Sequence, residues 1–332
     1  TATPFAGGRR GGFVRGSEGG QRAAADQVNI AQVIVTSIIS TAELGIVAIG
    51  LTMTFSILRF ANFAHASMAV IGAYIAYTFN VQLDMSLWLA FAAAMLVMGS
   101  FGIVVDRVIF RAMRNVGDLT PMIASLGLSL AIQYTVQAVW GPQFLLYTYD
   151  LVPGMVVFGA RITGPQLGII CTVVVAMLCF HLLLTQTKIG KAMRATATNP
   201  DLAQACSIDI DHVIRVVWFV GTAFAAIGGM FIAWDTQLNP YFGFNLIIPV
   251  FCVVLIGGVG SIYGAMLGAV IVGFASNFGV TINWGPILAA LGLADEYASF
   301  ELPVAYKPGI AYLIVIILLL LRPSGLTKRE LI

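Results

Sequence analysis

The sequence predicts an all-α membrane protein, a polytopic transmembrane helical bundle of about eight to ten membrane segments with a broken or re-entrant helix near residues 58–66. Of its 332 residues, 59% are hydrophobic and 10% are charged, whereas a soluble domain carries about 25% charged residues. The mean hydropathy is +0.93. Apolar runs near the bilayer-spanning length of about 20 residues recur along the chain. This composition excludes an ordinary soluble domain.

The apolar runs, read in chain order, are the candidate spans. They lie near residues 31–57, 64–79, 86–105, 120–140, 165–185, 214–234, 245–260, 263–281 and 304–321. Polar residues separate the first run from the second and predict the break, because hydrocarbon offers no hydrogen bonds to groups that leave a helix.

The first 28 residues have a different composition, rich in glycine and arginine and without hydrophobic periodicity. Such a segment cannot bury apolar surface and predicts a disordered tail. It lacks the apolar core of about 7–15 residues that a signal peptide contains. Its arginines allow a role at a membrane surface or on nucleic acid, but a passive extension is the simpler interpretation. We expect this tail at 1–28, one transmembrane domain at 29–326 and a cytoplasmic tail at 327–332.

Basic residues orient the spans, because cytoplasmic loops are enriched in Lys and Arg. They follow the third, fifth and last spans: Arg107, Arg111, Arg114, Lys188, Lys191, Arg194, Arg322, Lys328 and Arg329. The loops on the other side contain Arg161 as their single basic residue, and tryptophans border them as in an interfacial belt. The same count places the N-terminal tail outside, against its own arginines, so the side of the tail is left open.

Two glycine patterns concern packing. The segment Gly257–Ser261 lacks the lysine and hydroxyl of a phosphate-binding loop, so it predicts a tight turn between two helices. Small residues in the following run predict close helix packing: Gly264, Ala265, Gly268, Ala269 and Gly273. The sequence has no ATPase motif, so a nucleotide-driven step has to come from a partner.

The first span carries a polar stripe. Its members recur at helical spacing and share one face: Thr36, Ser40, Glu43, Gly50 and Thr54. Glu43 is the one acidic residue deep within the apolar runs. A carboxylate there is costly and normally faces a cavity or a partner. Glu43 therefore either faces a solute path or bonds to a neighbouring helix, and the sequence leaves both interpretations open.

The break itself contains Arg59, Asn62, His65 and Ser67. A lone histidine in an apolar helix is most often a structural hydrogen-bonding residue, but its polar neighbours and the break favour the lining of a solute route. The predicted substrate pathway consists of Glu43, Thr54, Asn62, His65 and Ser67.

The sequence predicts no chemistry of the chain's own. In the sequence, His181 and His212 lack partner ligands for a metal. The sequence contains no nucleophile elbow. The four cysteines are interpreted as inert thiols. We expect no enzymatic activity, no metal and no cofactor.

The cytoplasmic segment 186–213 is expected to be a long loop with one short helix. Asn199 suits an N-cap, Pro200 the first helical position and Asp201 the first turn. These signals predict a helix over about Pro200–Cys206 that serves as a docking element. A solvated loop is the alternative interpretation.

Several ordered motifs resemble those of branched-chain amino acid ABC transporter permeases, and more narrowly the first permease subunit of the high-affinity branched-chain system. They cover about residues 29–326 and include 50–65, 71–74, 190–195, 199–201, 208–213, 239–243 and 255–266. The resemblance assigns the ATPase-coupling loop to Arg194, Asn199, Pro200, Asp201, Ala205, Ser207 and Asp209. Such loops usually have glycine where this chain has Ser207, so the turn there is expected to differ in shape.

The resemblance implies a multi-pass subunit of the bacterial inner membrane. It implies four partners, namely a second homologous permease, two cytoplasmic ATPases that hydrolyse the ATP and a periplasmic solute-binding protein, and no nucleic acid. Cargo is a branched-chain amino acid or a related small polar solute, with urea and short-chain amides as alternatives. An ion-coupled secondary transporter or channel, with Glu43 or His65 as its ion site, is the alternative class.

Overall fold

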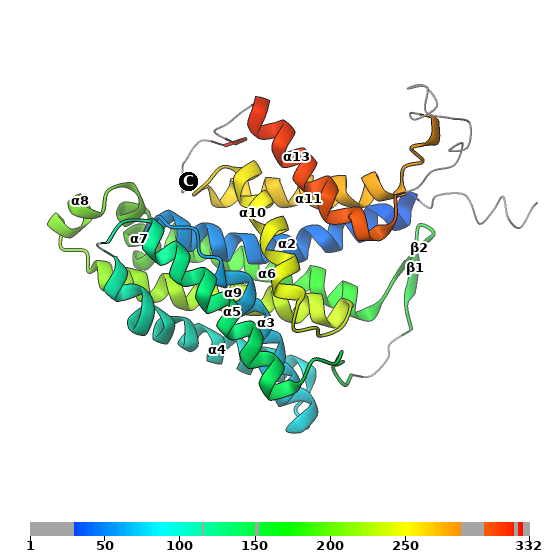
Figure 1. The fold of residues 1–332 in the computed structure, drawn as a ribbon, viewed down its shortest axis with the longest axis horizontal. Helices are drawn as coiled ribbons and strands as arrows, with labels where there is room; N and C mark the ends of the chain where they lie inside the picture. Colours follow the sequence, from blue (N-terminus) through cyan, green and yellow to red (C-terminus); the bar gives the residue numbers. More distant parts are fainter. Residues whose placement is uncertain (1–29, 115, 150–152, 287–301, 322–324, 328–332) are drawn as a thin grey trace, which may run out of the picture.

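The computed structural model describes residues 30–114, 116–149, 153–286, 302–321 and 325–327. The expected tail at 1–28 and most of the tail at 327–332 lie outside these residues. Figure 1 shows an elongated bundle with the hairpin β1 (Met155–Val157) and β2 (Ala160–Ile162) at one end and the helices α7 (Lys188–Thr198) and α8 (Pro200–Ala205) at the other. The expectation of an all-α bundle is confirmed.

A helix occupies each expected span. Seven helices within the described residues are long and apolar enough to cross a membrane, and α10 is a shorter apolar helix. The bounds are α2 (Ile30–Leu58), α3 (Ala64–Tyr77), α4 (Leu87–Val105), α5 (Leu119–Trp140), α6 (Gly164–Gln186), α9 (Ile210–Asp235), α10 (Phe242–Gly257), α11 (Ile262–Thr281) and α13 (Lys307–Leu321). The chain is a multi-pass membrane protein.

The break near residues 58–66 is present, since α2 ends at Leu58 and α3 begins at Ala64. Arg59 has a φ of 60°, a left-handed conformation that interrupts the helix. The Arg59 guanidinium donates to the Ala197 carbonyl of α7 at 3.5 Å. Phe60 stacks on Phe110, with ring centroids 5.1 Å apart. Arg59 therefore lies next to α7, while Phe60 and Asn62 are buried.

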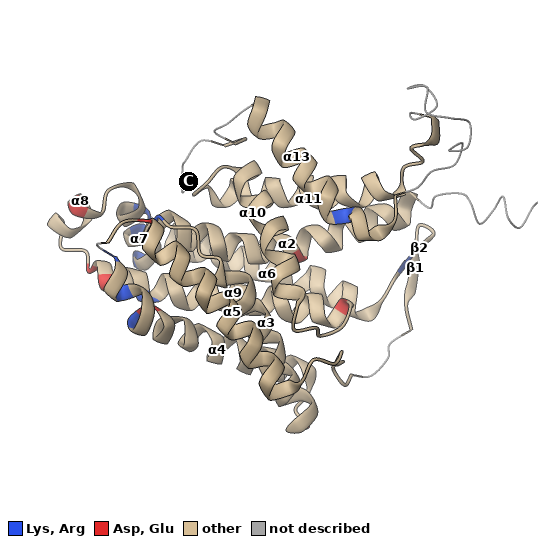
Figure 2. Cartoon of the chain, in the orientation of Figure 1, with Lys and Arg blue, Asp and Glu red and all other residues tan. Residues whose placement is uncertain are grey.

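Contacts at both ends of α2 show which end of the bundle each end of this helix reaches. In its first turn, the Gln32 amide oxygen accepts from the Arg161 backbone N–H of β2 at 2.8 Å. In its last turn, the Ser56 hydroxyl donates to the Gly260 carbonyl at 3.1 Å. Figure 2 shows most charged residues gathered at the end that carries α7 and α8. Since basic residues mark the cytoplasmic side, this distribution predicts that α2 begins at the outer end, where the hairpin lies.

The hairpin is a departure from the expected pattern of helices and loops. Its two strands pair antiparallel, with Val157 opposite Ala160. The two residues between them, Phe158 and Gly159, have φ of 50° and 82°, as in the primed two-residue turns that suit hairpins. Phenylalanine is not a usual first residue of such a turn, so the sequence carried no clear signal for it.

Helix α9 packs against α2, α3 and α4 and forms the centre of the bundle. Three of its glycines permit backbone approach: a Cβ on Gly221 would meet Thr54, one on Gly228 would meet Val47, and one on Gly229 would meet the backbone of Ala69. Helix α11 uses its small residues in the same way against α10 and α2. The predicted close packing is confirmed.

The predicted turn between α10 and α11 is confirmed. Gly258 and Gly260 have φ of 102° and 92°, conformations that glycine adopts without steric cost. The Ser261 hydroxyl accepts from the Gly264 N–H at 3.1 Å and caps α11. The Leu326 N–H donates to the Ile256 carbonyl at 2.9 Å, so the C-terminal segment 325–327 covers this turn.

Candidate functional site

The cytoplasmic end is built from helices with well-defined caps. The Asn199 side chain accepts from the Leu202 N–H at 3.1 Å, and Pro200 is the first residue of α8, which confirms the expected short helix; its docking role stays a prediction. The loop expected over 186–213 is wrong in one respect, because it also contains α7. Thr187 starts α7 by accepting from the Gly190 N–H at 3.0 Å. This threonine cap was the overlooked signal.

The turn after α8 depends on one unusual residue. Ser207 has a φ of 63°, which is a left-handed conformation. The Ser207 N–H donates to the Gln204 carbonyl at 2.9 Å, and the Ile208 N–H donates to the Ala203 carbonyl at 3.1 Å. This pairing closes the C-terminus of α8, where glycine is the usual residue. Asp209 then caps α9 by accepting from the His212 N–H at 3.0 Å.

Exposure separates the predicted coupling residues into two groups. Those that face solvent are Asn199, Asp201, Ala205, Ser207 and Asp209. Arg194 and Pro200 are half-buried. Leu202, which the sequence did not single out, is 62% exposed on α8. Helix α8 therefore presents a mixed apolar and acidic surface beyond the bundle.

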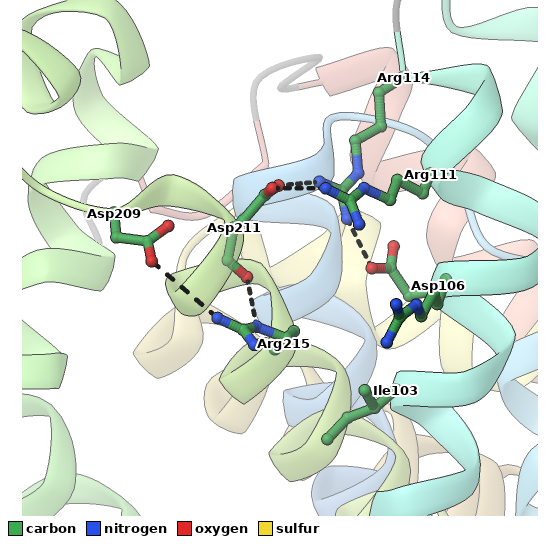
Figure 3. Close-up of a pocket in the computed structure, with 8 residues that line it drawn as sticks. Ile103, Asp106, Arg111, Arg114, Asp209, Asp211 and Arg215 are labelled. Carbon is green, nitrogen blue, oxygen red and sulfur yellow. Dashed lines mark hydrogen bonds and ion pairs between the residues drawn. The ribbon is translucent and has the colours of Figure 1, made fainter.

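A charged groove of about 500 Å³ lies between the end of α4 and the start of α9. One wall is the end of α4, which continues into the π-helix η2 (Asp106–Phe110) and the 3₁₀-helix η3 (Arg111–Met113). The other wall is the start of α9. Figure 3 shows Arg111 and Arg114 pointing toward Asp211 from across the groove. The Arg111–Asp211 pair measures 2.9 Å and the Arg114–Asp211 pair 2.7 Å.

Arg114 also holds the Asp106 carboxylate, at 2.5 Å. The Asp106 side chain is 4% exposed, so this pair is largely removed from water. On the other wall, the Arg215 side chain donates to the Asp211 carbonyl at 3.2 Å. The network ties the end of α4 to the first turn of α9, which directly follows α8.

Apart from the exposed Arg59, the polar residues predicted near the helix break are buried and bonded to protein. The His65 side chain is 0% exposed, and its Nε2 lies 3.1 Å from the Val47 carbonyl of α2. The hydroxyls of Ser67 and Ser129 are 2.7 Å apart and join α3 to α5. Asn62 Oδ1 accepts from the Ala64 N–H at 3.1 Å. Thr54 donates to the Gly50 and Leu51 carbonyls within α2.

These four contacts suit a structural role in the single subunit, and contact of Thr54, Asn62, His65 or Ser67 with solute stays a prediction. Glu43 is partly accessible, and its Oε1 is buried without a hydrogen-bond partner among the described residues, as are Asn62 Nδ2 and His65 Nδ1. Lys307, at the start of α13, interacts electrostatically with Glu43 and was not singled out by the sequence, because it borders an apolar run.

Comparison with known proteins identifies the family of this chain. The family model described as the permease component of the branched-chain amino acid transport system matches residues 33–321. The chain belongs to this family. The permease is similar to the high-affinity branched-chain amino acid transport system permease protein LivH of Salmonella typhimurium, with 30% identity over 86% of this chain and 91% of that protein.

BraD, the permease protein of the high-affinity branched-chain amino acid transport system of Pseudomonas aeruginosa, is 29% identical over 90% of this chain and 95% of its own length. Among solved structures, PsaBC from Streptococcus pneumoniae in complex with Fab covers 92% of this chain and 97% of its own, at 13% identity and a TM-score of 0.48. That likeness is too distant to inform the site. The sequence relatives place the permease among transport proteins.

Proposed function

We propose that the permease is the membrane-spanning subunit of a binding-protein-dependent ABC importer of the bacterial inner membrane. Its cargo is a branched-chain amino acid or a closely related small solute. The observation that carries the proposal is the family match over residues 33–321, which includes both the bundle and α8. The relatives' names supply the cargo class.

The energy comes from two cytoplasmic ATPases, since the sequence has no ATPase motif. ATP is their substrate, and the permease itself needs no cofactor. A second, homologous permease completes the pathway across the membrane, and a periplasmic binding protein delivers the solute at the end that carries the β1–β2 hairpin.

Helix α8 is the proposed contact with the ATPases. It is exposed at the cytoplasmic end, its start is fixed by Asn199, and its end is joined to α9 through the Ser207 turn. When the ATPases close, a shift of α8 acts on α9 directly and on α4 through the ion pairs of Asp211. Because α9 packs against α2, α3 and α4, such a shift can reach most of the bundle.

Reconstitution tests this function. The permease is placed in liposomes with the ATPases and the second permease encoded by adjacent genes, and uptake of radiolabelled leucine is measured with ATP inside and the binding protein outside. We expect uptake to require both. The substitution Asp201→Ala on α8 should lower uptake by about tenfold, the equivalent of 1.4 kcal/mol of docking energy, with leucine affinity of the binding protein unchanged.

Asp118→Ala is the matched control, because Asp118 is also an exposed cytoplasmic carboxylate but caps no backbone N–H with its side chain. It should leave uptake unchanged. Leucine uptake without ATPases, driven by a proton gradient, would instead assign the permease to secondary transport. Preferential uptake of urea or acetamide would overturn the proposed cargo.

A further inference from the structure

Charged groups of opposite sign lie on facing helices inside the outer half of the bundle. Glu43 is the fourteenth of the 29 residues of α2, so it lies about 20 Å from the outer end of that helix at 1.5 Å per residue. Lys307 is the first residue of α13. Ionisable residues at such depth are costly and normally serve a partner or a solute path.

Ser40 connects these two helices. Lys307 Nζ donates to Ser40 Oγ at 3.1 Å, and Asn277 Nδ2 of α11 donates to the same oxygen at 3.2 Å. Asn277 is itself held in place, since its Nδ2 also donates to the Gly273 carbonyl at 2.7 Å. Ser40 stands three residues before Glu43, so both lie on one face of α2. The Lys307 ammonium is thereby held over the face that carries Glu43.

This polar cluster, Ser40, Glu43, Asn277 and Lys307, is incompletely paired. Glu43 and Lys307 lie close enough to interact electrostatically, yet no ion pair within 4.0 Å joins them among the described residues. Glu43 Oε1 is buried and accepts no hydrogen bond there. Ser40 Oγ accepts two bonds, and its own proton has no acceptor within the described part of the chain.

Within the described residues, the incompletely satisfied groups are a carboxylate oxygen without a hydrogen-bond donor, an ammonium group without an ion-pair partner within 4.0 Å, and a hydroxyl group that can donate. Ser40, Glu43 and Lys307 are all partly accessible, so the packed core of the subunit does not enclose them fully. Unpaired charges in a low-dielectric interior are unfavourable. A ligand that supplies one positive and one negative group would satisfy both.

We propose that this cluster binds the charged end of a zwitterionic amino acid during its passage through the permease. The ligand's α-ammonium group binds Glu43, and its α-carboxylate binds Lys307 and the Ser40 hydroxyl. This assignment rests on the proposed function and adds the residues that recognise the cargo. Asp235, at the outer end of α9, interacts electrostatically with both charges and adds negative charge on the side from which the ammonium group approaches.

The assignment also predicts selectivity. Urea and short-chain amides carry no charge, so they would leave both Glu43 and Lys307 unpaired. A site built around charged and hydrogen-bonding groups rejects ligands that lack them, because its buried groups then remain unsatisfied. The cluster should therefore favour amino acids over neutral amides of similar size, independently of the binding protein.

Competition binding tests the proposal on the assembled transporter in detergent without the binding protein. Bound radiolabelled leucine is displaced by leucine, by leucinamide, which lacks the carboxylate, and by 4-methylpentanoate, which lacks the ammonium group. For the wild type, we expect leucine to compete at least about tenfold better than either analogue. Glu43→Gln should abolish the preference over 4-methylpentanoate alone, and Lys307→Met the preference over leucinamide alone.

These preferences are ratios within one variant, so they do not depend on the fraction of protein that folds. Ser37→Ala is the control, because Ser37 is buried on α2 and donates to Val33 within its own helix; both preferences should persist. Unchanged preferences in Glu43→Gln and Lys307→Met, or equal losses for both analogues, would overturn the site. If the wild-type transporter takes up leucine in liposomes, that outcome leaves the proposed function standing; absence of uptake would count against the function itself.

Discussion

Replacing Arg114 with methionine should destabilise the permease far more than the same change at Arg111. Arg114 bridges Asp106 and Asp211, and the Asp106 side chain is 4% exposed. The Arg111–Asp211 pair lies at the surface, with side chains 54% and 50% exposed. Removing one partner of a buried pair leaves an uncompensated charge and costs about 3–5 kcal/mol.

The Arg114 side chain is 22% exposed, so solvent reduces part of this cost. We expect a loss of about 2–3 kcal/mol in the free energy of unfolding for Arg114→Met. For Arg111→Met we expect less than about 1 kcal/mol, as for other exposed pairs. The double variant Asp106→Asn with Arg114→Met should be more stable than Arg114→Met alone, because asparagine leaves no buried charge behind.

Unfolding of the purified permease in mixed micelles, with an increasing fraction of denaturing detergent, measures these differences. Tryptophan fluorescence is a suitable signal, because Trp218 stacks on Phe110 of the same η2 turn at 5.1 Å. Equal losses for the two arginine variants would refute the reasoning. A double variant that loses the sum of both single losses would also refute it.

The remaining predictions concern other parts of the fold. Ser207→Gly should stabilise the turn after α8 by about 1 kcal/mol, because Ser207 has a φ of 63°; a lower melting temperature in detergent would contradict this. Gly50→Ala should cost about 1–3 kcal/mol through overpacking, because its Cβ would lie 2.7 Å from the Gly221 carbonyl. The control Gly127→Ala meets nothing within 4 Å and should not destabilise. Burial raises the pKa of the Tyr147 phenol in the outer loop, and its hydroxyl donates to the Ala73 carbonyl at 2.9 Å. The unfolded chain therefore loses this proton first, so stability should fall above about pH 10 by up to 1.4 kcal/mol per pH unit. Tyr147→Phe should show a shallower fall in alkaline unfolding curves, and identical slopes would contradict the assignment.

Local signals in the sequence predicted local structure well. Asn199 and Pro200 begin α8 as expected, and the glycines at 258 and 260 make the expected turn. The break after Leu58 was also predictable, from polar residues between two apolar runs. Each of these depends on the backbone preferences of a few neighbouring residues. Where the local residue was atypical, as at Phe158 in the hairpin turn, prediction failed.

The class of the protein follows from the sequence alone, because composition acts through the membrane rather than through particular contacts. The basic loops predict the orientation of most spans for the same reason. Only the tertiary structure decided which polar residues meet. Lys307 and Ser40 are 267 residues apart, and Arg114 and Asp211 are 97 apart. Such pairs depend on which faces of distant helices pack together, and in this bundle the approach of backbones at glycine sets those faces.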